Sequence, residues 1–215
     1  MNERKFAFFC MLSGILILSL FHQPLAAFER VVSFFHVDSM IYEQSESLLI
    51  DDFSKSNGIS SVGTQWRMFT DQVMGGVSTG EWNYDTIDGR RCVHLRGDVS
   101  LENNGGFVQV ALPLTKEGQS FDASSYKGVR LWARGNGEVY HIHLRSSDTR
   151  LPWQYYGAKF VTDSSWSMYD LPFSDFEQEN LRTELKPDKL IRIAIVAIKK
   201  EFKADIAVAR LEFYR

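Results

Sequence analysis

The chain has 215 residues, of which 44% are hydrophobic and 24% are charged, with 15 Gly, 5 Pro and 16 Phe. These values are ordinary for a globular protein and exclude a disordered chain, a collagen-like repeat and a small disulfide-stapled scaffold. The formal charge of −3 argues against the basic surface that phosphate neutralisation requires, so nucleic acid is not an expected partner.

The N-terminus has the pattern of a secretory signal peptide. Arg4 and Lys5 precede an uncharged apolar run over residues 6–21, and Leu25-Ala26-Ala27 follows with small residues typical of a cleavage site. The run is roughly 16 residues, which is short for a membrane-spanning helix of about 20. We therefore expect residues 1–27 to be a signal peptide cleaved after Ala27. Without cleavage, the same segment would act as a signal anchor and provide the only expected membrane contact.

This segment predicts export to the periplasm or cell envelope. Met40 offers an alternative start, and a chain that began there would be cytoplasmic. Cleavage would also remove Cys10 and leave Cys92 alone, so no internal disulfide is expected.

Residues 28–47 show no sustained hydrophobic period and are expected to form a linker, whereas residues 48–215 read as one all-β domain. One or two helical turns are expected over Ser174–Leu181. Short strands without long helices between them predict an antiparallel β-sandwich, with Greek-key or jelly-roll connections. The expected strands are Leu48–Phe53, Trp66–Phe69, Ser78–Tyr84, Cys92–Asp98, Gly106–Leu112, Gly128–Arg134, Val139–Arg145, Tyr155–Thr162, Ser167–Leu171, Leu190–Ile198 and Asp205–Tyr214.

The pair Asn136-Gly137 lies between two of these strands and is typical of a tight primed turn. A hairpin closed by that turn would set Trp132 opposite His141 and Arg130 opposite His143. Alternation then predicts that one face enters the core. Its members are Val129, Leu131 and Ala133 with Tyr140, Ile142 and Leu144.

The strand Leu190–Ile198 alternates in the same way. Ile191, Ile193 and Ile195 are expected to face the core, and Arg192, Ala194 and Val196 the other side. Burying one such isoleucine stabilises the folded protein by roughly 1.5–3 kcal/mol relative to leaving it exposed.

Patterns that would indicate catalysis or a metal are weak. Gly76-Val77-Ser78-Thr79-Gly80 matches a nucleophile elbow, but the residues that follow read as strand rather than helix. His141 and His143 have a spacing that zinc sites use, and Cys92 with His94 could add ligands only if the strands were neighbours. We therefore expect no enzymatic activity, no metal and no cofactor.

The outward face of the expected hairpin is the more interesting surface. Trp and Tyr rings beside hydrogen-bonding groups can stack on sugar rings or dock a protein partner. The alternative is that residues 28–47 cover these rings, or that the rings simply complete the sandwich. The residues proposed for ligand binding are Trp132, His141, His143, Trp153 and Tyr155.

Two glycine-rich motifs carry a resemblance to a known family. The first is Trp66-Arg67-x-x-x-Asp71-Gln72-Val73-Met74-Gly75-Gly76-Val77-Ser78-x-Gly80, and the second is Leu101-Glu102-Asn103-Asn104-Gly105-Gly106-Phe107. Four shorter matches follow in the same order: Tyr126-x-Gly128-Val-Arg-Leu, Arg134-Gly135-Asn136-Gly137-x-x-Tyr140, Trp153-Gln154-Tyr155 and Leu171-Pro172-Phe173-x-x-Phe176. From about Leu48 to Arg215, the chain resembles the complex I intermediate-associated protein 30 family.

This resemblance implies a galactose-binding-like jelly roll and a chaperone-like role in the assembly of respiratory complex I, with no catalytic residues. The family-motif residues are Asp71, Met74, Gly75, Gly76, Ser78, Asn103, Asn104, Gly105 and Gly106. Paired glycines suit turns with positive φ, while Asp71 and Asn103 can bond local backbone amides, so the motifs can hold two loops together.

Two hypotheses follow. The first is a non-catalytic binding protein that resembles complex I assembly factors, with respiratory-complex subunits as partners. The second is an envelope module that binds a carbohydrate or another ligand through an aromatic face. Export favours the second, because the mitochondrial family members act on the matrix side.

Overall fold

The computed structural model describes residues 47–215, apart from residues 56 and 117. The expected signal peptide and all but the last residue of the expected linker lie outside the described residues. In the described part the strands are β1 (Leu48–Asp51), β2 (Arg67–Thr70), β3 (Thr79–Ile87), β4 (Arg90–Val99), β5 (Phe107–Pro113), β6 (Gly128–Gly135), β7 (Val139–Ser146), β8 (Tyr155–Val161), β9 (Ser167–Pro172), β10 (Glu177–Glu179), β11 (Leu190–Ile198) and β12 (Phe202–Tyr214). Short 3₁₀ turns are η1 (Asp71–Met74), η2 (Glu102–Asn104), η3 (Phe173–Asp175) and η4 (Pro187–Lys189).

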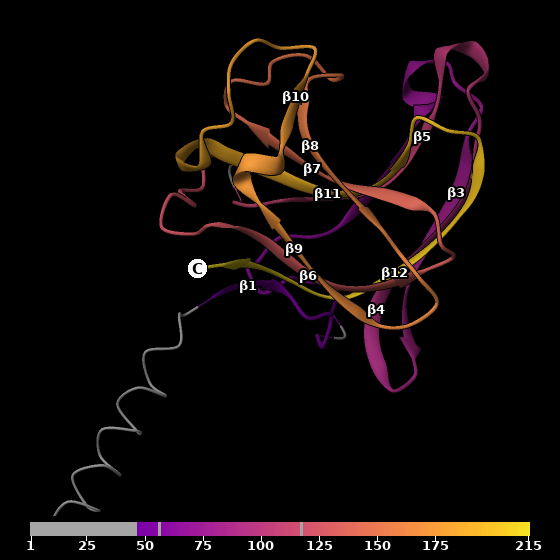
Figure 1. The fold of residues 1–215 in the computed structure, drawn as a ribbon, viewed down its shortest axis with the longest axis horizontal. Helices are drawn as coiled ribbons and strands as arrows, with labels where there is room; N and C mark the ends of the chain where they lie inside the picture. Colours follow the sequence, from indigo (N-terminus) through magenta and orange to yellow (C-terminus); the bar gives the residue numbers. More distant parts are fainter. Residues whose placement is uncertain (1–46, 56, 117) are drawn as a thin grey trace, which may run out of the picture. The chain divides into compact units, whose positions relative to one another are not determined.

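The strands form two antiparallel sheets that pack face to face. Sheet I has the order β3-β4-β12-β6-β9, with β1 also paired to β12, and sheet II has the order β10-β8-β7-β11-β5-β2. Figure 1 shows β6, β9 and β12 in one layer and β7, β8 and β11 in the other. The expected all-β sandwich is confirmed, and each of the eleven expected strands is present.

The core lies between the sheets and follows from alternation along each strand. All six residues predicted for the inward face of β6 and β7 belong to it. Tyr140 and Tyr156 are the largest side chains that are fully buried there. Aromatic packing closes the end near the C-terminus, where Phe213 stacks on Phe121 with ring centroids 5.5 Å apart.

The expected β6–β7 hairpin is wrong. Trp132 of β6 pairs with Arg210 and Met168 in sheet I, whereas His141 of β7 pairs with Lys159 and Val196 in sheet II. The Asn-Gly turn therefore carries the chain from one sheet to the other. A hairpin and such an arch bury the same alternate residues, so alternation does not distinguish them.

Side-chain bonds of Asn136 stabilise this crossing. Its amide donates to the carbonyl of Lys203 at 2.7 Å, and its Oδ1 accepts from the hydroxyl of Tyr140 at 2.8 Å. The same hydroxyl accepts the backbone N–H of Asp205 at 2.8 Å. The turn is thus tied to β12.

Two further expectations are corrected. The pairing of β11 with β7 shifts between Leu190 and Arg192, so Ile191 sits at a bulge and is only half-buried while Leu190 enters the core. The expected helical turns over Ser174–Leu181 reduce to η3, and the chain then forms the edge strand β10 against β8.

Ile193 is fully buried between the sheets, whereas Arg192 faces outward on the same strand. Ile193→Asp should lower the free energy of unfolding by at least about 4 kcal/mol, since it removes buried apolar surface and introduces a buried charge. Arg192→Asp should cost much less. Equal urea midpoints for the two variants would contradict this assignment.

Candidate functional site

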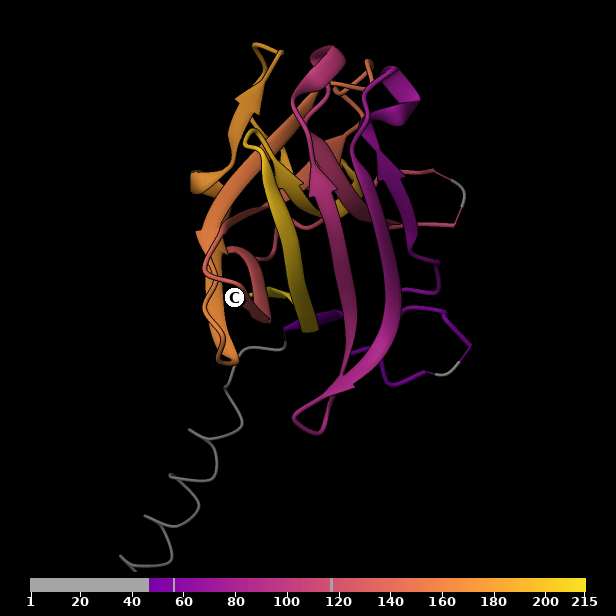
Figure 2. The ribbon, with the colours of Figure 1, turned by 90° about the vertical axis from the view of Figure 1, so that its right-hand side faces the viewer.

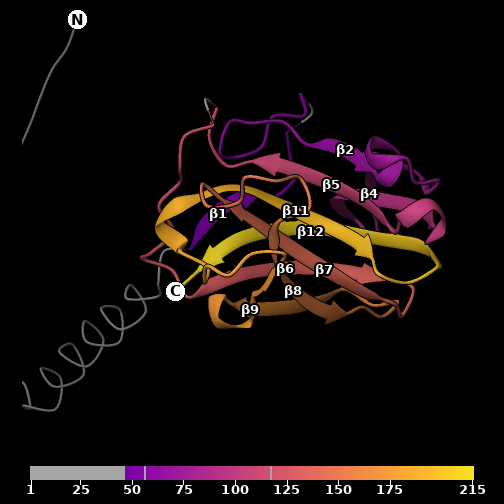
Figure 3. The same cartoon turned by 90° about the horizontal axis from the view of Figure 1, so that it is seen from above.

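A groove with a volume of about 520 Å³ crosses the outer face of sheet II. Figure 3 looks onto this sheet, with β2, β5, β11, β7 and β8 side by side. The lining combines four aromatic rings with polar and charged groups and an aliphatic floor. The rings belong to Phe69, Phe107, Trp153 and Tyr155, the polar and charged groups to Gln109, His143, Arg145, Glu179, Asn180, Arg192 and Lys199, and the floor includes Ala194, Val196 and Ile198.

The register of the strands explains why this face is hollow. Ala111, Ala194, His143 and Gly157 stand opposite one another on four adjacent strands, and three of these four residues are small. At Gly157 a Cβ atom would lie 3.3 Å from His143 Cδ2 and 3.2 Å from the ring of Tyr155. The glycine therefore leaves room for the imidazole to lie flat.

His143 forms the polar part of the floor. Its ring stacks on Tyr155 at a centroid distance of 3.7 Å and an angle of 12°, and His141 meets it edge-on at 5.8 Å. Only 6% of His143 is exposed, and its Nε2 has no hydrogen-bond partner among the described residues.

Both groove-side histidines are neutral at physiological pH. Burial, followed by the repulsion that a protonated His143 would meet from a protonated His141 and from Lys199, holds the pKa of His143 well below its ordinary value. Burial and then the charges of Lys199 and Lys159 lower the pKa of His141 to about 4. His143 is therefore an uncharged ring in the floor of the groove, with a buried Nε2 that has no partner among the described residues.

The loop before β8 is held in place at one edge of the groove. Gln154 donates from Nε2 to the carbonyl of Asn180 at 3.0 Å and accepts the backbone N–H of Leu151 at 3.0 Å. Asn180 in turn donates to the carbonyl of Trp153 at 3.4 Å. This fixes the backbone that carries Trp153, whose side chain is 49% exposed.

The two glycine-rich motifs form another edge. Turns η1 and η2 lie at the same end of the sandwich, as the purple and magenta loops in Figure 2 show. The carboxylate of Asp71 joins them. It accepts hydrogen bonds from the hydroxyl and the backbone N–H of Ser78, the latter at 2.9 Å, and from the N–H of Gly106 at 2.5 Å.

We call this arrangement the Asp71 clasp. Asp71 and Ser78 are both fully buried. Burial alone would raise the pKa of Asp71, but the hydrogen bonds from Ser78, Gly106 and Phe107 outweigh it, and the net pKa lies below its ordinary value. The carboxylate is thus charged and saturated by protein donors.

The glycines of the motifs divide into two kinds. Gly75 and Gly106 have φ of 89° and 127°, where a side chain would be strained. Gly76 and Gly105 instead allow close approach, since a Cβ atom at either would lie 2.5 Å from an oxygen of Asp71. Asn103 adopts a φ of 54°.

The structure places the predicted site residues in three groups. His143, Trp153 and Tyr155 line the groove, with His141 beside His143. Trp132 lies on sheet I, under the guanidinium of Arg90 at 5.4 Å from the ring centroid, so the single aromatic face expected from the hairpin is wrong. Met74, Gly105 and Gly106 also line the groove, and the other family-motif residues belong to η1, η2 or the loops that flank them.

Sequence reasoning missed Phe69, Phe107, Arg145 and Arg192 as groove residues. One signal was available: Arg192 is the only charged residue in the otherwise apolar strand Leu190–Ile198. A lone arginine at such a position needs a partner or an exposed head.

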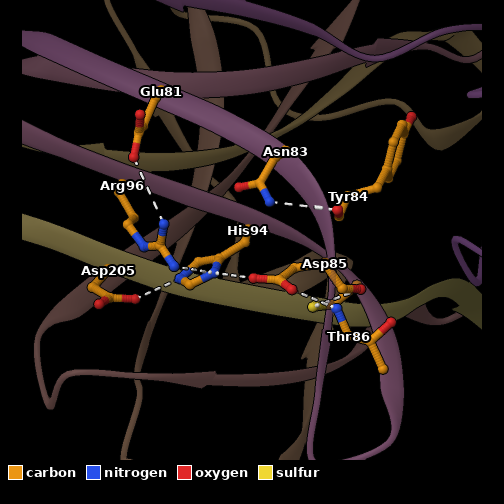
Figure 4. A network of polar contacts seen from close by, with 9 residues as sticks. Glu81, Asn83, Tyr84, Asp85, Thr86, His94, Arg96 and Asp205 are labelled. Atoms are coloured by element: carbon orange, nitrogen blue, oxygen red, sulfur yellow. Dashed lines mark hydrogen bonds and ion pairs between the residues drawn. The ribbon is translucent and has the colours of Figure 1, made fainter.

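A second polar cluster occupies the outer face of sheet I (Figure 4). His94 Nε2 contacts Asp205 at 2.7 Å, and Arg96 contacts His94 Nδ1 at 3.0 Å. Since a guanidinium can only donate, Nδ1 accepts and Nε2–H donates to Asp205. This cluster is satisfied by its own members.

The weaker chemical patterns do not assemble into a centre. Cys92 and His94 belong to sheet I and His141 and His143 to sheet II. The thiol of Cys92 is buried, which raises its pKa to about 11. Across the described residues, no group of three or more His, Cys, Asp or Glu side chains is placed to hold a metal ion.

None of the helical segments that the structure describes is long and apolar enough to cross a membrane.

Asp71→Asn should destabilise the protein at pH 7 by about 3 kcal/mol, because an amide cannot replace a carboxylate that accepts from several buried donors. Asp98→Asn, which breaks an exposed contact to Lys203, should cost at most about 1 kcal/mol. Urea unfolding of both variants measures the difference. If the two variants lose comparable free energy of unfolding, the hydrogen bonds of Asp71 contribute no more to stability than an exposed ion pair does.

The destabilisation caused by Asp71→Asn should depend on pH. A folded-state pKa below the unfolded value of about 3.9 means that the clasp contributes fully above that value and loses its contribution as pH falls through the folded-state pKa. The stability difference between wild type and Asp71→Asn should therefore be constant from pH 7 to about 5 and shrink below about 4. A difference that grew on acidification would refute the assignment.

Comparison with solved structures shows the fold. A family 11 carbohydrate-binding module of a cellulosomal cellulase of Clostridium thermocellum superposes with a TM-score of 0.61 at 13% identity, covering 80% of this chain and 96% of that one. The family 11 module from Clostridium thermocellum in complex with a β-1,3-1,4-mixed-linked tetrasaccharide gives 0.59 at 14% identity, covering 78% and 94%. The architecture is therefore that of these jelly-roll modules.

Comparison with sequences identifies the family. No curated protein matches significantly. The profile of the family described as Complex I intermediate-associated protein 30 matches residues 52–205, a range that contains both glycine-rich motifs and most of the sandwich. The chain belongs to the complex I intermediate-associated protein 30 family.

Proposed function

We propose that this protein is a non-catalytic binding protein of the assembly-factor type, and that it holds a segment of a protein partner in the groove of sheet II. Subunits of a respiratory complex are the partners that family membership favours.

The observation that carries this proposal is the exposed apolar rim of the groove. Val73 and Met74 of η1 are 69% and 46% exposed, and Trp153 of the β7–β8 loop is 49% exposed. Exposed aliphatic and Met side chains around a concave surface are typical of sites for protein segments, because they give adaptable apolar contact without hydrogen bonds. Two separate loops supply this rim.

An open groove also suits an extended segment. Strands β5, β11 and β7 form its floor, while the Asp71 clasp and the Gln154 bonds hold its edges. Such a preformed surface reduces the ordering cost of binding.

A carbohydrate ligand is the second candidate. The half-exposed indole of Trp153 lies in the same groove as the amides of Gln109 and Asn180, and rings beside amides suit sugars. One of the similar solved modules was determined with a tetrasaccharide, which supports this candidate only by analogy of fold.

The expected place of action remains the cell envelope. Determination of the N-terminal residue of the native protein, together with fractionation, tests the expectations of cleavage after Ala27 and of export. A mature chain found in the cytoplasm would contradict them.

Cross-linking and co-purification of tagged protein should enrich respiratory-complex subunits, and Met74→Glu should reduce their recovery about tenfold. Met168→Glu is a matched control, since Met168 is 49% exposed but lies on sheet I. Equal loss in both variants, or no enriched protein at all, would sink the proposal. Binding to a glycan array that Trp153→Ala abolishes would instead favour the carbohydrate candidate.

A further inference from the structure

Positively charged side chains gather along one side of the groove. Arg145 of β7 and Arg192 of β11 stand directly opposite each other, and both line it. Arg67 of β2 lies across β5 from them, paired with Ala111. Burial and then the charge of Arg192 lower the pKa of Arg145, and burial and then the charge of Arg67 lower the pKa of Arg192. Arg192 therefore repels both Arg145 and Arg67.

No carboxylate offsets this repulsion within the part of the chain that the structure describes. The arginines in ion pairs there are Arg96, Arg130, Arg134 and Arg210, and not Arg67, Arg145 or Arg192. The groove has one acidic lining residue, Glu179, and it is paired with Lys199 at 2.6 Å. The groove thus has a net positive side without an internal counter-charge.

The two lining arginines are also positioned for binding. Arg145 donates from Nη2 to the carbonyls of Thr149 and Leu151, both at 3.0 Å, and from Nε to the hydroxyl of Thr149 at 3.3 Å. Its Nη1 takes no part in these bonds. The guanidinium of Arg192 lies over Phe69 at 5.7 Å from the ring centroid. Arg145 thus keeps Nη1 for a ligand, while the guanidinium of Arg192, which has no hydrogen-bond partner among the described residues, can bind a carboxylate through two nitrogens.

His143 supplies an independent indication of a ligand. It lies two residues before Arg145 on the same face of β7 and opposite Ala194. It is 6% exposed, and its Nε2 has no partner among the described residues. A buried ring nitrogen without a hydrogen bond is costly, and here that cost falls in the floor of the groove, beside Arg145.

Resting on the function proposed above, we propose that the partner segment bound in the groove is acidic: a side-chain or terminal carboxylate lies between Arg145 and Arg192, and the neighbouring backbone of the segment lies over the floor that includes His143. Apolar side chains on either side of the acidic residue contact the rim formed by Val73, Met74 and Trp153. Arg67 adds long-range attraction. The segment is thus an acidic residue among apolar ones, in an extended conformation.

Selection of random dodecapeptides displayed on phage, with the full-length protein as bait, tests this directly. Wild type should enrich peptides with Asp or Glu at a constant distance from apolar residues. A recovered peptide should bind Arg192→Gln or Arg145→Gln about tenfold or more weakly than wild type. Replacing Glu by Gln in that peptide should weaken its binding to wild type by a similar factor. The same replacement should weaken binding to the arginine variants little further, because the pair is already broken; such non-additivity indicates direct contact between the two groups.

Matched variants separate charge loss from misfolding. Arg134→Gln removes an arginine from sheet I, where it pairs with Asp88, and should leave selection unchanged. Arg192→Lys keeps the charge without the fork, so it should retain the acidic preference at reduced affinity. Thermal unfolding of every variant identifies those that are folded. If Arg192→Gln does not fold, Arg145→Gln and Arg192→Lys decide the result.

The outcomes distinguish the two proposals. Enrichment of apolar peptides without an acidic position, or affinity that does not respond to the folded arginine variants, overturns the acidic segment and leaves the proposed function standing. Failure to enrich any peptide counts against both. Binding of oligogalacturonate instead of peptides, lost in Arg192→Gln, would assign the carboxylate to a uronate sugar and overturn the polypeptide ligand.

Discussion

The buried carboxylate of Asp71 is the interaction on which the groove end of this sandwich depends. It lies between β2 of sheet II and β3 of sheet I, and it bonds Ser78 and Gly106. Gly106 lies in the connection that returns from β4 of sheet I to β5 of sheet II. One charged group therefore joins two crossovers between the sheets, and in a largely dry site such bonds are strong. The two glycine-rich motifs of this chain build the clasp, which shapes an edge of the groove.

Much of the fold was predictable because burial of one face leaves a period of two in the sequence. That period located the strands, the inward residues of β6 and β7, and Ile193 and Ile195 of β11. It failed where two arrangements bury the same residues: a hairpin and an arch at Asn136 are identical in alternation, and only the neighbours of Trp132 and His141 separate them. The bulge at Ile191 was equally hidden, because Leu190 and Ile191 are both apolar and either can enter the core.

The groove was harder to predict, for a different reason. Its lining combines residues of β2, β5, β11 and β7 that are far apart in the sequence, and its hollow depends on Ala111, Ala194 and Gly157 standing in one row. Small residues within strands do not predict a groove from the sequence, because a groove forms only where the order and register of the strands place them side by side. His143, Trp153 and Tyr155 were identified by residue type, and the register shows why the first and last of them touch.

The groove carries features that stability alone does not explain. Half-buried Arg145 and Arg192 face each other without a carboxylate among the described residues, and His143 keeps an unpaired ring nitrogen beside them. Each feature lowers the stability of the unoccupied sandwich. Two other polar clusters are satisfied by their own members: Asp71 in the clasp accepts from several donors, and His94 on sheet I is bonded at both nitrogens. Because Arg145 and Arg192 line the groove together and neither forms an ion pair among the described residues, the groove is the surface where the proposed partner supplies the missing counter-charge.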